Sequence, residues 1–320
     1  MKVTKHLLAL ISIFTVLLLA ACGSNEDDAK NTAEAPKEKE EGYTVEHAMG
    51  ETTLEKTPEK VVILTNEGTE ALLALGVTPV GAVQSWTGDP WYEHIAEDMK
   101  DVEVVGVESQ VNVEAIAALQ PDLIIGNKMR QEDIYEQLKA IAPTVFAEDL
   151  RGNWKNNFEL YAKAVNKEEK GKEVLAAYDQ RIEDFKEKLG DKLDTKVSMV
   201  RFMAGDVRIY HKDSFSGVIL EQIGLARPES QDKEDFAEKG VTKERIPAMD
   251  GDILFYFTYD EGDGKATEVE KEWIEDPLFQ NLEVAKKGEV HKVDDAIWNT
   301  AGGVMAANLM LDDLEKHMLK

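Results

Sequence analysis

Cationic, aromatic and amide side chains stand in or just after several segments that have the apolar pattern of buried strands. The residues of this kind are Trp86, Asn127, Lys128, Arg130, Arg201, Arg208, Tyr210, Tyr259, Trp298 and Asn299. Arginine and lysine pair with anionic groups, and tryptophan and tyrosine can form the walls of a binding site. Because loops after parallel strands meet at one edge of a sheet, these side chains predict a pocket for a fairly large anionic ligand.

Arg201 and Arg208 are the most informative of these residues because they lie inside strand patterns, at 197–202 and 207–210. A guanidinium group is costly to bury unless an acid or a ligand pairs with it. The chain has 63 aspartates and glutamates, so an internal salt bridge is the alternative partner for either arginine. The sequence leaves both readings open.

The motifs that would indicate an enzyme are absent from the sequence. There is no Walker-type phosphate loop, and Asp213-Ser214-Phe215-Ser216-Gly217 lacks the first glycine of a Gly-x-Ser-x-Gly elbow. Histidines at 47, 94, 211, 291 and 317 are never at metal-ligand spacing, so a zinc or manganese site would need distant ones to meet. We therefore expect no catalytic residue, no protein metal site and no cofactor, with an extracellular α/β enzyme as the less supported alternative.

Strand and helix patterns alternate along the chain on both sides of residue 154. The first half has short apolar strand patterns at 61–64, 80–83, 103–106, 122–125 and 144–146, with helical spacing at 70–75, 115–119 and 134–141. After residue 190 the apolar segments are 197–202, 207–210, 215–223, 253–257 and 289–293, with a final helix at 303–318. This order predicts an α/β protein with two Rossmann-like lobes and mostly parallel sheets.

A single long helix is predicted between the lobes. Apolar residues recur at helical spacing from Trp154 to Leu189 without a proline, and a kink or break near Asn166 or Gly171 stays open. Such a helix is longer than is usual inside a compact domain, and it should resist hinge opening. We assign residues 43–153 to an N-terminal lobe, 154–190 to the connecting helix and 191–320 to a C-terminal lobe.

An internal repeat relates the two lobes. Residues 114–124 align without gaps to residues 244–254, which places Glu114 and Glu244 at equivalent positions where a helix begins. In α/β units this end of a helix lies at the ligand-binding edge of the sheet, so both glutamates should lie near the rim of a cleft. Two simpler explanations stay open: helix-to-strand junctions resemble one another, and acids are favoured in a first helical turn.

The N-terminus has the pattern of an export signal. Lys2 and Lys5 precede an apolar stretch at 7–19, and Leu19-Ala20-Ala21-Cys22 follows, with Cys22 the only cysteine of the chain. This predicts a signal peptide at 1–21, lipidation of Cys22 and a solvated tether at 22–42. An ordinary signal peptide that leaves a free thiol at Cys22 is the alternative. An intrachain disulfide is excluded in either case.

The charge of the chain excludes polyanionic partners. Without residues 1–21, 35 basic residues face 63 acidic ones, a net charge of −28. Such a surface repels nucleic acid and anionic headgroups. A length of 278 residues after the tether suits two lobes of about 120 to 140 residues.

Five segments identify a family that the chain resembles. They are LGVTPVGAVQSW at 75–86, PDLII at 121–125 with Lys128 and Arg130, IAPTV at 141–145, RIY at 208–210 and WNTAGG at 298–303. With them, the chain resembles the iron-siderophore substrate-binding lipoproteins of Gram-positive ABC importers. It is most similar to the subgroup that takes citrate-based siderophores, such as staphyloferrin B and schizokinen.

The resemblance implies a monomeric protein, lipid-anchored on the outer face of the cell membrane, that delivers a ferric siderophore to an ABC permease dimer and its ATPase. It implies that Lys128, Arg130, Arg201 and Arg208 neutralise the ligand, that Trp86 and Trp298 wall the pocket, and that Tyr210 and Asn299 donate hydrogen bonds. Glu114 and Glu244 would dock on the permease. Iron would be held by the siderophore alone.

A binding protein of the same architecture for haem, cobalamin or a bare metal ion is the alternative. Haem would require an axial histidine or tyrosine in the cleft, and Tyr210 and Tyr259 are the candidates.

Overall fold

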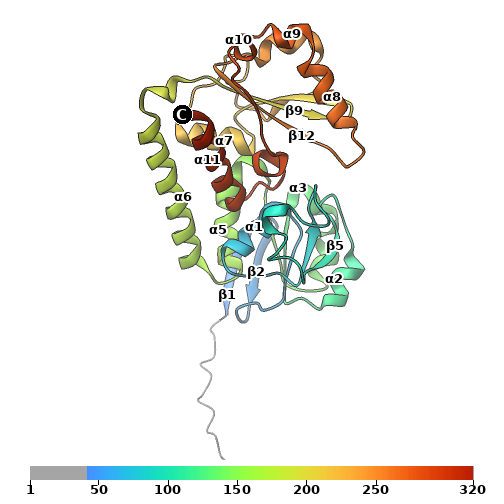
Figure 1. Ribbon diagram of the computed structural model, residues 1–320. Coiled ribbons are helices and arrows are strands. Elements are labelled where there is room, and N and C mark those ends of the chain that lie inside the picture. Colours follow the sequence, from blue (N-terminus) through green and yellow to red (C-terminus); the bar gives the residue numbers. More distant parts are fainter. Residues whose placement is uncertain (1–41, 320) are drawn as a thin grey trace, which may run out of the picture. The chain divides into compact units, whose positions relative to one another are not determined.

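The computed structural model describes residues 42–319 of the chain (Figure 1). The predicted signal peptide, the lipidation of Cys22 and nearly all of the tether lie outside these residues. No helix within 42–319 is long and apolar enough to cross a membrane.

A six-stranded sheet forms the centre of the N-terminal lobe. Its strands follow the order β6-β5-β4-β3-β7-β8, and all neighbours are parallel except β5 and β6. The strands are β3 (Val61–Ile63), β4 (Gly81–Gln84), β5 (Glu103–Val107), β6 (Gln110–Val111), β7 (Leu123–Asn127) and β8 (Thr144–Ala147). All three residues of β3 are buried, as expected for a central strand covered on both faces.

Short helices connect the strands of this lobe. They are α1 (Asn66–Ala74), α2 (Val113–Leu119), α3 (Lys128–Gln131) and α4 (Tyr135–Lys139), with 3-10 turns η1 (Glu93–Ile95) and η2 (Glu132–Ile134). Thr65 and Asn112 are the N-caps of α1 and α2, and the side chain of each accepts from the backbone N–H three residues ahead. A hairpin of β1 (Tyr43–His47) and β2 (Gly50–Leu54), which the sequence reading missed, precedes the sheet.

A five-stranded sheet forms the centre of the C-terminal lobe, in the order β11-β10-β9-β12-β13. Its strands are β9 (Val197–Met203), β10 (Asp206–Tyr210), β11 (Ala237–Glu238), β12 (Ile253–Tyr259) and β13 (Val290–Lys292). The pairs β9–β12 and β12–β13 are parallel, whereas β10 pairs antiparallel with both of its neighbours. The remaining elements are α7 (Phe215–Ile223), η5 (Lys243–Met249), α8 (Lys265–Ile274), α9 (Pro277–Gln280), α10 (Glu283–Lys286), η6 (Ala296–Thr300) and α11 (Val304–Met318).

Two helices, rather than one, occupy the segment predicted as a single connecting helix. Helix α5 (Trp154–Ala164) follows η3 (Arg151–Asn153), and α6 (Glu168–Leu189) begins after a three-residue break. The break includes Asn166, one of the two positions named as a candidate, whose φ of 55° lies in the left-handed region. Helix α6 has 22 residues and, as Figure 1 shows, runs from one lobe to the other.

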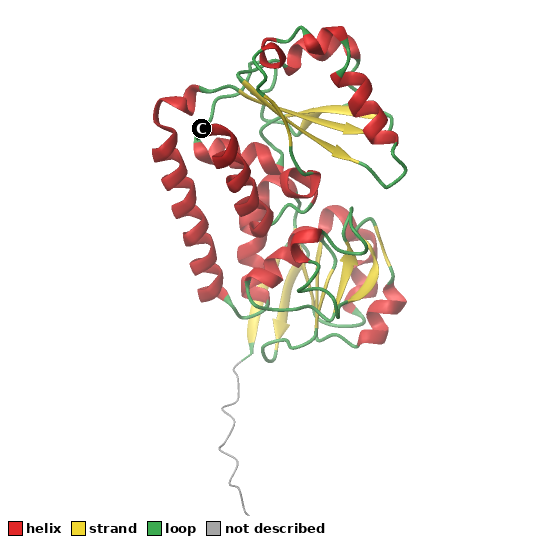
Figure 2. Ribbon diagram, viewed as in Figure 1, coloured by secondary structure: helices red, strands yellow, loops and turns green. Residues whose placement is uncertain are grey.

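One continuous apolar core joins the two lobes. Helices α1, α5, α6, α7 and α11 pack against one another beside the two sheets (Figure 2). Their cluster of buried residues includes Val61 and Ile125 from the first sheet and Phe255 and Phe257 from the second. Each sheet has one smaller apolar cluster on its outer face. This shared core and the length of α6 both oppose a large hinge motion between the lobes.

The two halves of the internal repeat occupy equivalent places. Glu114 is the second residue of α2, which leads into β7, and Glu244 is the second residue of η5, which leads into β12. Both glutamates are exposed. The helix of the second copy is a 3-10 helix and contains Pro247, which has no backbone N–H to donate.

Candidate functional site

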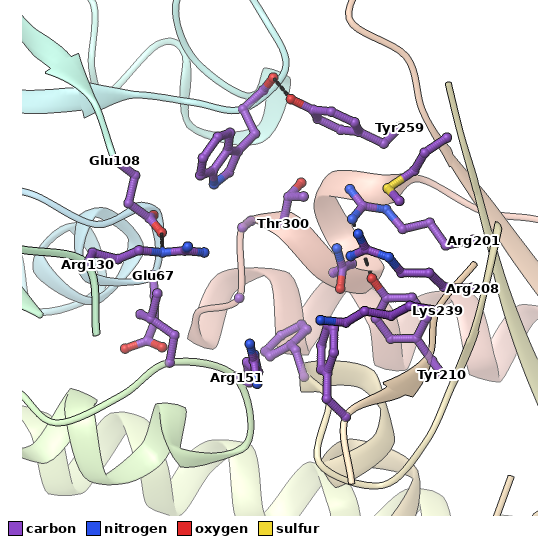
Figure 3. Close-up of a pocket in the computed structure, with 18 of the residues that line it drawn as sticks. Glu67, Glu108, Arg130, Arg151, Arg201, Arg208, Tyr210, Lys239, Tyr259 and Thr300 are labelled. Carbon is purple, nitrogen blue, oxygen red and sulfur yellow. Dashed lines mark hydrogen bonds and ion pairs between the residues drawn. The ribbon is translucent and has the colours of Figure 1, made fainter. Parts of the chain in front are cut away.

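A pocket of about 480 Å3 lies between the two sheets and is lined by both lobes (Figure 3). Its walls in the N-terminal lobe follow the carboxyl ends of parallel strands: Glu67 after β3, Trp86 after β4, Glu108 after β5 and Arg130 after β7. This is the edge at which open α/β sheets bind ligands. The C-terminal lobe contributes Arg201, Met203, Arg208, Tyr210, Phe215, Phe236, Lys239, Tyr259, Glu261, Asn299, Thr300, Ala301 and Gly302.

Six of the eight residues predicted to bind the ligand line this pocket. They are Trp86, Arg130, Arg201, Arg208, Tyr210 and Asn299. Tyr259, noted at the end of a strand pattern, lines it as well, and its hydroxyl donates to the carbonyl oxygen of Trp86 at 3.4 Å. That bond joins the end of β12 to the loop after β4, so it spans the two lobes.

Trp298 does not form a wall of the pocket, and this prediction was wrong. The π-helical turn η6 directs its ring into the core, where it is fully buried and stacks on Phe255 with the ring centroids 4.5 Å apart. Its indole N–H donates to Oδ2 of Asp313 at 2.9 Å. The next residues of the turn, Asn299 and Thr300, face the pocket instead.

Lys128 also lies outside the pocket lining. Its Nζ pairs with Oε1 of Glu148 at 2.8 Å, and this pair raises the pKa of the lysine. Glu148 follows β8, the strand next to the one that leads into Lys128, so the sheet brings an acid within reach. The sequence pattern could not show that contact.

Arg201 and Arg208 are directly opposite each other on the paired strands β9 and β10. Like charges at such a position repel, and nearby acids offset the repulsion. Arg201 is buried and makes a bidentate pair with Asp295, at 2.6 Å and 3.0 Å, while Nε of Arg208 donates to Asp206 at 2.7 Å. Both readings of these arginines therefore hold together, since each has an internal acid and each lines the pocket.

The surroundings of Arg201 keep it charged and fixed in place. Burial opposes the charged form, but Tyr210 and Asp295 outweigh it and raise the pKa of the guanidinium. Nη1 contacts the hydroxyl of Tyr210 at 3.4 Å, and the guanidinium carbon lies 4.8 Å from the ring centroid of Tyr259. A charge held by an acid and an aromatic face is preorganised for an anionic ligand.

Two buried acids in the N-terminal wall were missed by the sequence reading. Glu108 accepts from Nε of Arg130 at 3.1 Å and from the backbone and side-chain nitrogens of Asn66, at 3.0 Å and 3.1 Å. Glu67 accepts from the side chain of Asn157 at 2.9 Å. Burial raises the pKa of Glu67 well above its usual value, although the hydrogen bond from Asn157 opposes the shift. Glu67 is thus favoured as a neutral acid.

Two further cations, Arg151 and Lys239, line the pocket and were also missed. Arg151 is in the short η3 turn and Lys239 directly follows β11, and neither belongs to a strand pattern that the sequence shows clearly. Glu67, Glu108 and Arg151 each follow the carboxyl end of a strand, and this position is the local signal that could have indicated their place in the pocket.

The two predicted docking glutamates, Glu114 and Glu244, are not in the lining of the pocket. A hydrogen bond from Thr242 lowers the pKa of Glu244, so this exposed side chain is a carboxylate at neutral pH. Within residues 42–319 there is no cluster of three or more histidines, cysteines and acids arranged to hold a metal ion.

Comparison with known proteins places the chain among binding proteins. The periplasmic binding protein family matches residues 61–296. The probable siderophore-binding lipoprotein YfiY of Bacillus subtilis is 52% identical over 325 residues, which cover 99% of each chain. The Fe(3+)-citrate-binding protein YfmC of the same organism is 31% identical, with 96% of each chain covered.

A solved structure agrees with these sequence matches. The crystal structure of Staphylococcus aureus SirA complexed with staphyloferrin B superposes with a TM-score of 0.80 at 34% identity. The match covers 86% of this chain and 98% of that one.

Proposed function

The chain belongs to the periplasmic binding protein family, and on this premise we propose that it captures a ferric siderophore and delivers it to an ABC importer. Members and relatives are binding proteins, and the proposed role involves no chemical conversion of the ligand. The siderophore supplies the oxygen ligands of the iron, so the protein needs neither a metal site of its own nor a cofactor.

The observation that carries the proposal is the cationic lining of the pocket. Five of its side chains are arginines or lysines, although the chain as a whole is strongly acidic. Basic residues gathered in one cavity of an acidic protein mark the site of an anionic ligand. A volume of about 480 Å3 falls in the range of about 300 to 1,000 Å3 that small-molecule sites occupy.

Citrate-based siderophores are the ligand class that we propose. Their iron complexes carry carboxylates, which suit bidentate arginines better than neutral hydroxamate complexes do. The ligands named for two relatives, Fe(3+)-citrate for YfmC and staphyloferrin B for SirA, support this class. Trp86 and Tyr259 provide the aromatic walls, and Asn299 and Thr300 provide polar contacts.

Haem is a less suitable ligand for this pocket. Tyr210 is fully buried between Phe236 and Phe257, and its hydroxyl already contacts Arg201. The pKa of Tyr259 is raised by burial, which disfavours the tyrosinate that binds haem iron.

Delivery is proposed to use the two exposed glutamates. Glu114 and Glu244 occupy equivalent helix starts in the two lobes, and each would pair with arginines of one half of a permease dimer that its ATPase drives. A lipid on Cys22 would hold the monomeric protein on the outer face of the membrane. The description of the relative YfiY as a lipoprotein supports this location.

Fluorescence titration of the purified protein tests the proposal. Ferric staphyloferrin B, ferric schizokinen, ferric citrate, a ferric catecholate and haem are added separately. We expect saturable quenching by the citrate-based complexes, because Trp86 lines the pocket while Trp298 and Trp154 are buried in the core. The matched control is Trp86→Phe, which should still bind but quench less. Saturation by haem alone, or by none of the five, would contradict the proposal.

A further inference from the structure

Two of the five cations in the pocket have no acid bound to them. Arg130 pairs with Glu108, Arg201 with Asp295 and Arg208 with Asp206. Arg151 and Lys239 form no ion pair with any residue in the part of the chain that the structure describes. The pocket therefore contains three neutralised cations and two whose charge is unmet.

The two unmatched cations meet at one aromatic ring. The guanidinium carbon of Arg151 lies 4.2 Å from the ring centroid of Phe236, and Nζ of Lys239 lies 5.5 Å from the same centroid. Figure 3 shows both side chains ending at the same side of the pocket. An aromatic face attracts a cation but does not cancel its charge, so two cations at one ring repel each other until an anion binds between them.

The acids around Arg151 do not substitute for that anion. Both carboxylate oxygens of Asp149 accept from the side chain of Asn153, at 2.8 Å and 2.9 Å. Asp213 interacts with the charge of Arg151 at a distance, but burial of Asp213 acts against its ionisation and raises its pKa. Neither acid forms an ion pair with Arg151.

The backbone of Arg151 gives an independent indication. Its φ of 77° lies in the left-handed region, which glycine and asparagine adopt readily and arginine does not. A residue that keeps an unfavourable backbone at a binding site points to a role for its side chain in that site.

We propose that Arg151, Lys239 and Phe236 form a subsite for a carboxylate of the ligand that is not bound to iron. This inference rests on the proposed function and makes it more specific. The protein would then select complexes whose ligands outnumber the coordination positions of the metal, so that at least one carboxylate stays uncoordinated. Ferric dicitrate is such a complex, because two citrates offer more oxygen groups than the roughly six positions of ferric iron can take.

The test compares ferric citrate with the ferric complex of citrate monoamide, in which one terminal carboxylate is a carboxamide. The variants are Arg151→Asn, which removes the charge and suits the left-handed backbone, and Lys239→Gln. Lys128→Gln is the matched control, since Lys128 is a nearby cation outside the pocket lining. Dissociation constants are measured by fluorescence titration, and the melting temperature of each variant by circular dichroism.

We expect each pocket variant to weaken ferric citrate binding about tenfold, as loss of a charge-assisted contact does. Binding of the monoamide complex should change by less than about twofold for the same variants. Lys128→Gln should change neither, and Arg151→Asn should melt at the same or a higher temperature, because it relieves the backbone. A residue with a purely structural role would instead lower the melting temperature when replaced.

Two results separate this inference from the function on which it rests. If wild type binds ferric citrate and both pocket variants bind it equally well, the subsite is wrong and siderophore binding stands. If wild type binds ferric staphyloferrin B but not ferric citrate, the two variants are compared with ferric staphyloferrin B instead. An equal loss of affinity in both variants then supports the subsite, and an unchanged affinity refutes it. If wild type binds no ferric complex, the proposed function and the subsite both fail.

Discussion

Replacing Glu70 with alanine should lower the free energy of unfolding by about 2 to 4 kcal/mol. Glu70 lies on α1 in the N-terminal lobe and is fully buried. One carboxylate oxygen accepts from the backbone nitrogen of Ala306 at 2.9 Å, in the first turn of α11, and the other contacts Nε2 of His94 at 2.5 Å. Glu70 therefore caps a helix that is 236 positions away in the chain.

The size of this loss of stability follows from the two hydrogen-bond partners of Glu70, which alanine cannot contact. The N–H of Ala306 is one of the donors at a helix start that have no partner within the helix, and leaving it unsatisfied costs about 1 to 3 kcal/mol. Breaking a fully buried ion pair costs about 3 to 5 kcal/mol, but the His94 side chain is 14% exposed and water can replace part of its lost contact. The pair should then add about 1 kcal/mol or somewhat more.

Urea unfolding, followed by tryptophan fluorescence and by circular dichroism, measures the change. Glu70→Gln keeps an acceptor for Ala306 and should cost less than Glu70→Ala. Glu169→Ala removes an exposed acid of α6 that pairs with exposed Lys172, and it should stay within about 0.5 kcal/mol of wild type. If Glu70→Ala is as stable as Glu169→Ala, the bond between α1 and α11 does not stabilise the fold as argued.

Four further predictions concern the pocket and its walls. Trp298→Ala should lower the free energy of unfolding in urea by about 3 to 5 kcal/mol, because it leaves a cavity in the core. Trp86→Ala should weaken ligand binding and leave the free energy of unfolding nearly unchanged. Equal effects of the two variants on stability would contradict the assignment of Trp298 to the core. Asp295→Ala should cost about 3 to 5 kcal/mol, since it leaves the buried Arg201 unpaired, and a stability equal to that of wild type would show that the bidentate pair is dispensable. The pKa of Glu67 is raised on folding, so its contribution to stability is complete below the ordinary glutamate pKa and is lost as the pH rises through the pKa of the folded state. The stability gained by Glu67→Gln should therefore grow from pH 5 to pH 8. A gain that does not depend on pH would contradict the neutral form of Glu67. Small-angle scattering should detect no large rotation of the lobes on ligand binding, given their shared core, and a marked decrease of the radius of gyration would refute that expectation.

Most strands of both sheets were predictable because their signals are local, whereas the two-residue edge strands β6 and β11 were not predicted. The apolar run at 61–63 is a buried strand, and the long apolar periodicity after Trp154 is helical, as the spacing indicates. The break at Asn166 was only one of two candidate positions, because a left-handed residue leaves little trace in an apolar pattern. The hairpin at 43–54 was missed since its strands are mostly polar.

The binding residues were predictable where a strand carried them. Arg201 and Arg208 are in strands of the second sheet, and Trp86 and Arg130 follow strands of the first. Their places relative to these strands indicated that they face one pocket, although they are far apart along the chain. Trp298 was misplaced because a π-helical turn rotates it into the core, and Lys128 because Glu148 binds it. In both cases a neighbour from another element decided the outcome, and no local pattern specifies such a neighbour.

The sequence by itself determined the α/β class, the two lobes, the cationic character of the site and the equivalence of Glu114 with Glu244. Those features depend on the periodicity, composition and internal repeat of the sequence, which are properties of the chain before it folds. Only the tertiary structure decided which cations keep an unmet charge, since ion pairing is set by distances of a few ångströms between elements far apart in sequence. Glu108 neutralises Arg130 and Asp295 neutralises Arg201, whereas Arg151 and Lys239 meet at Phe236 without an acid.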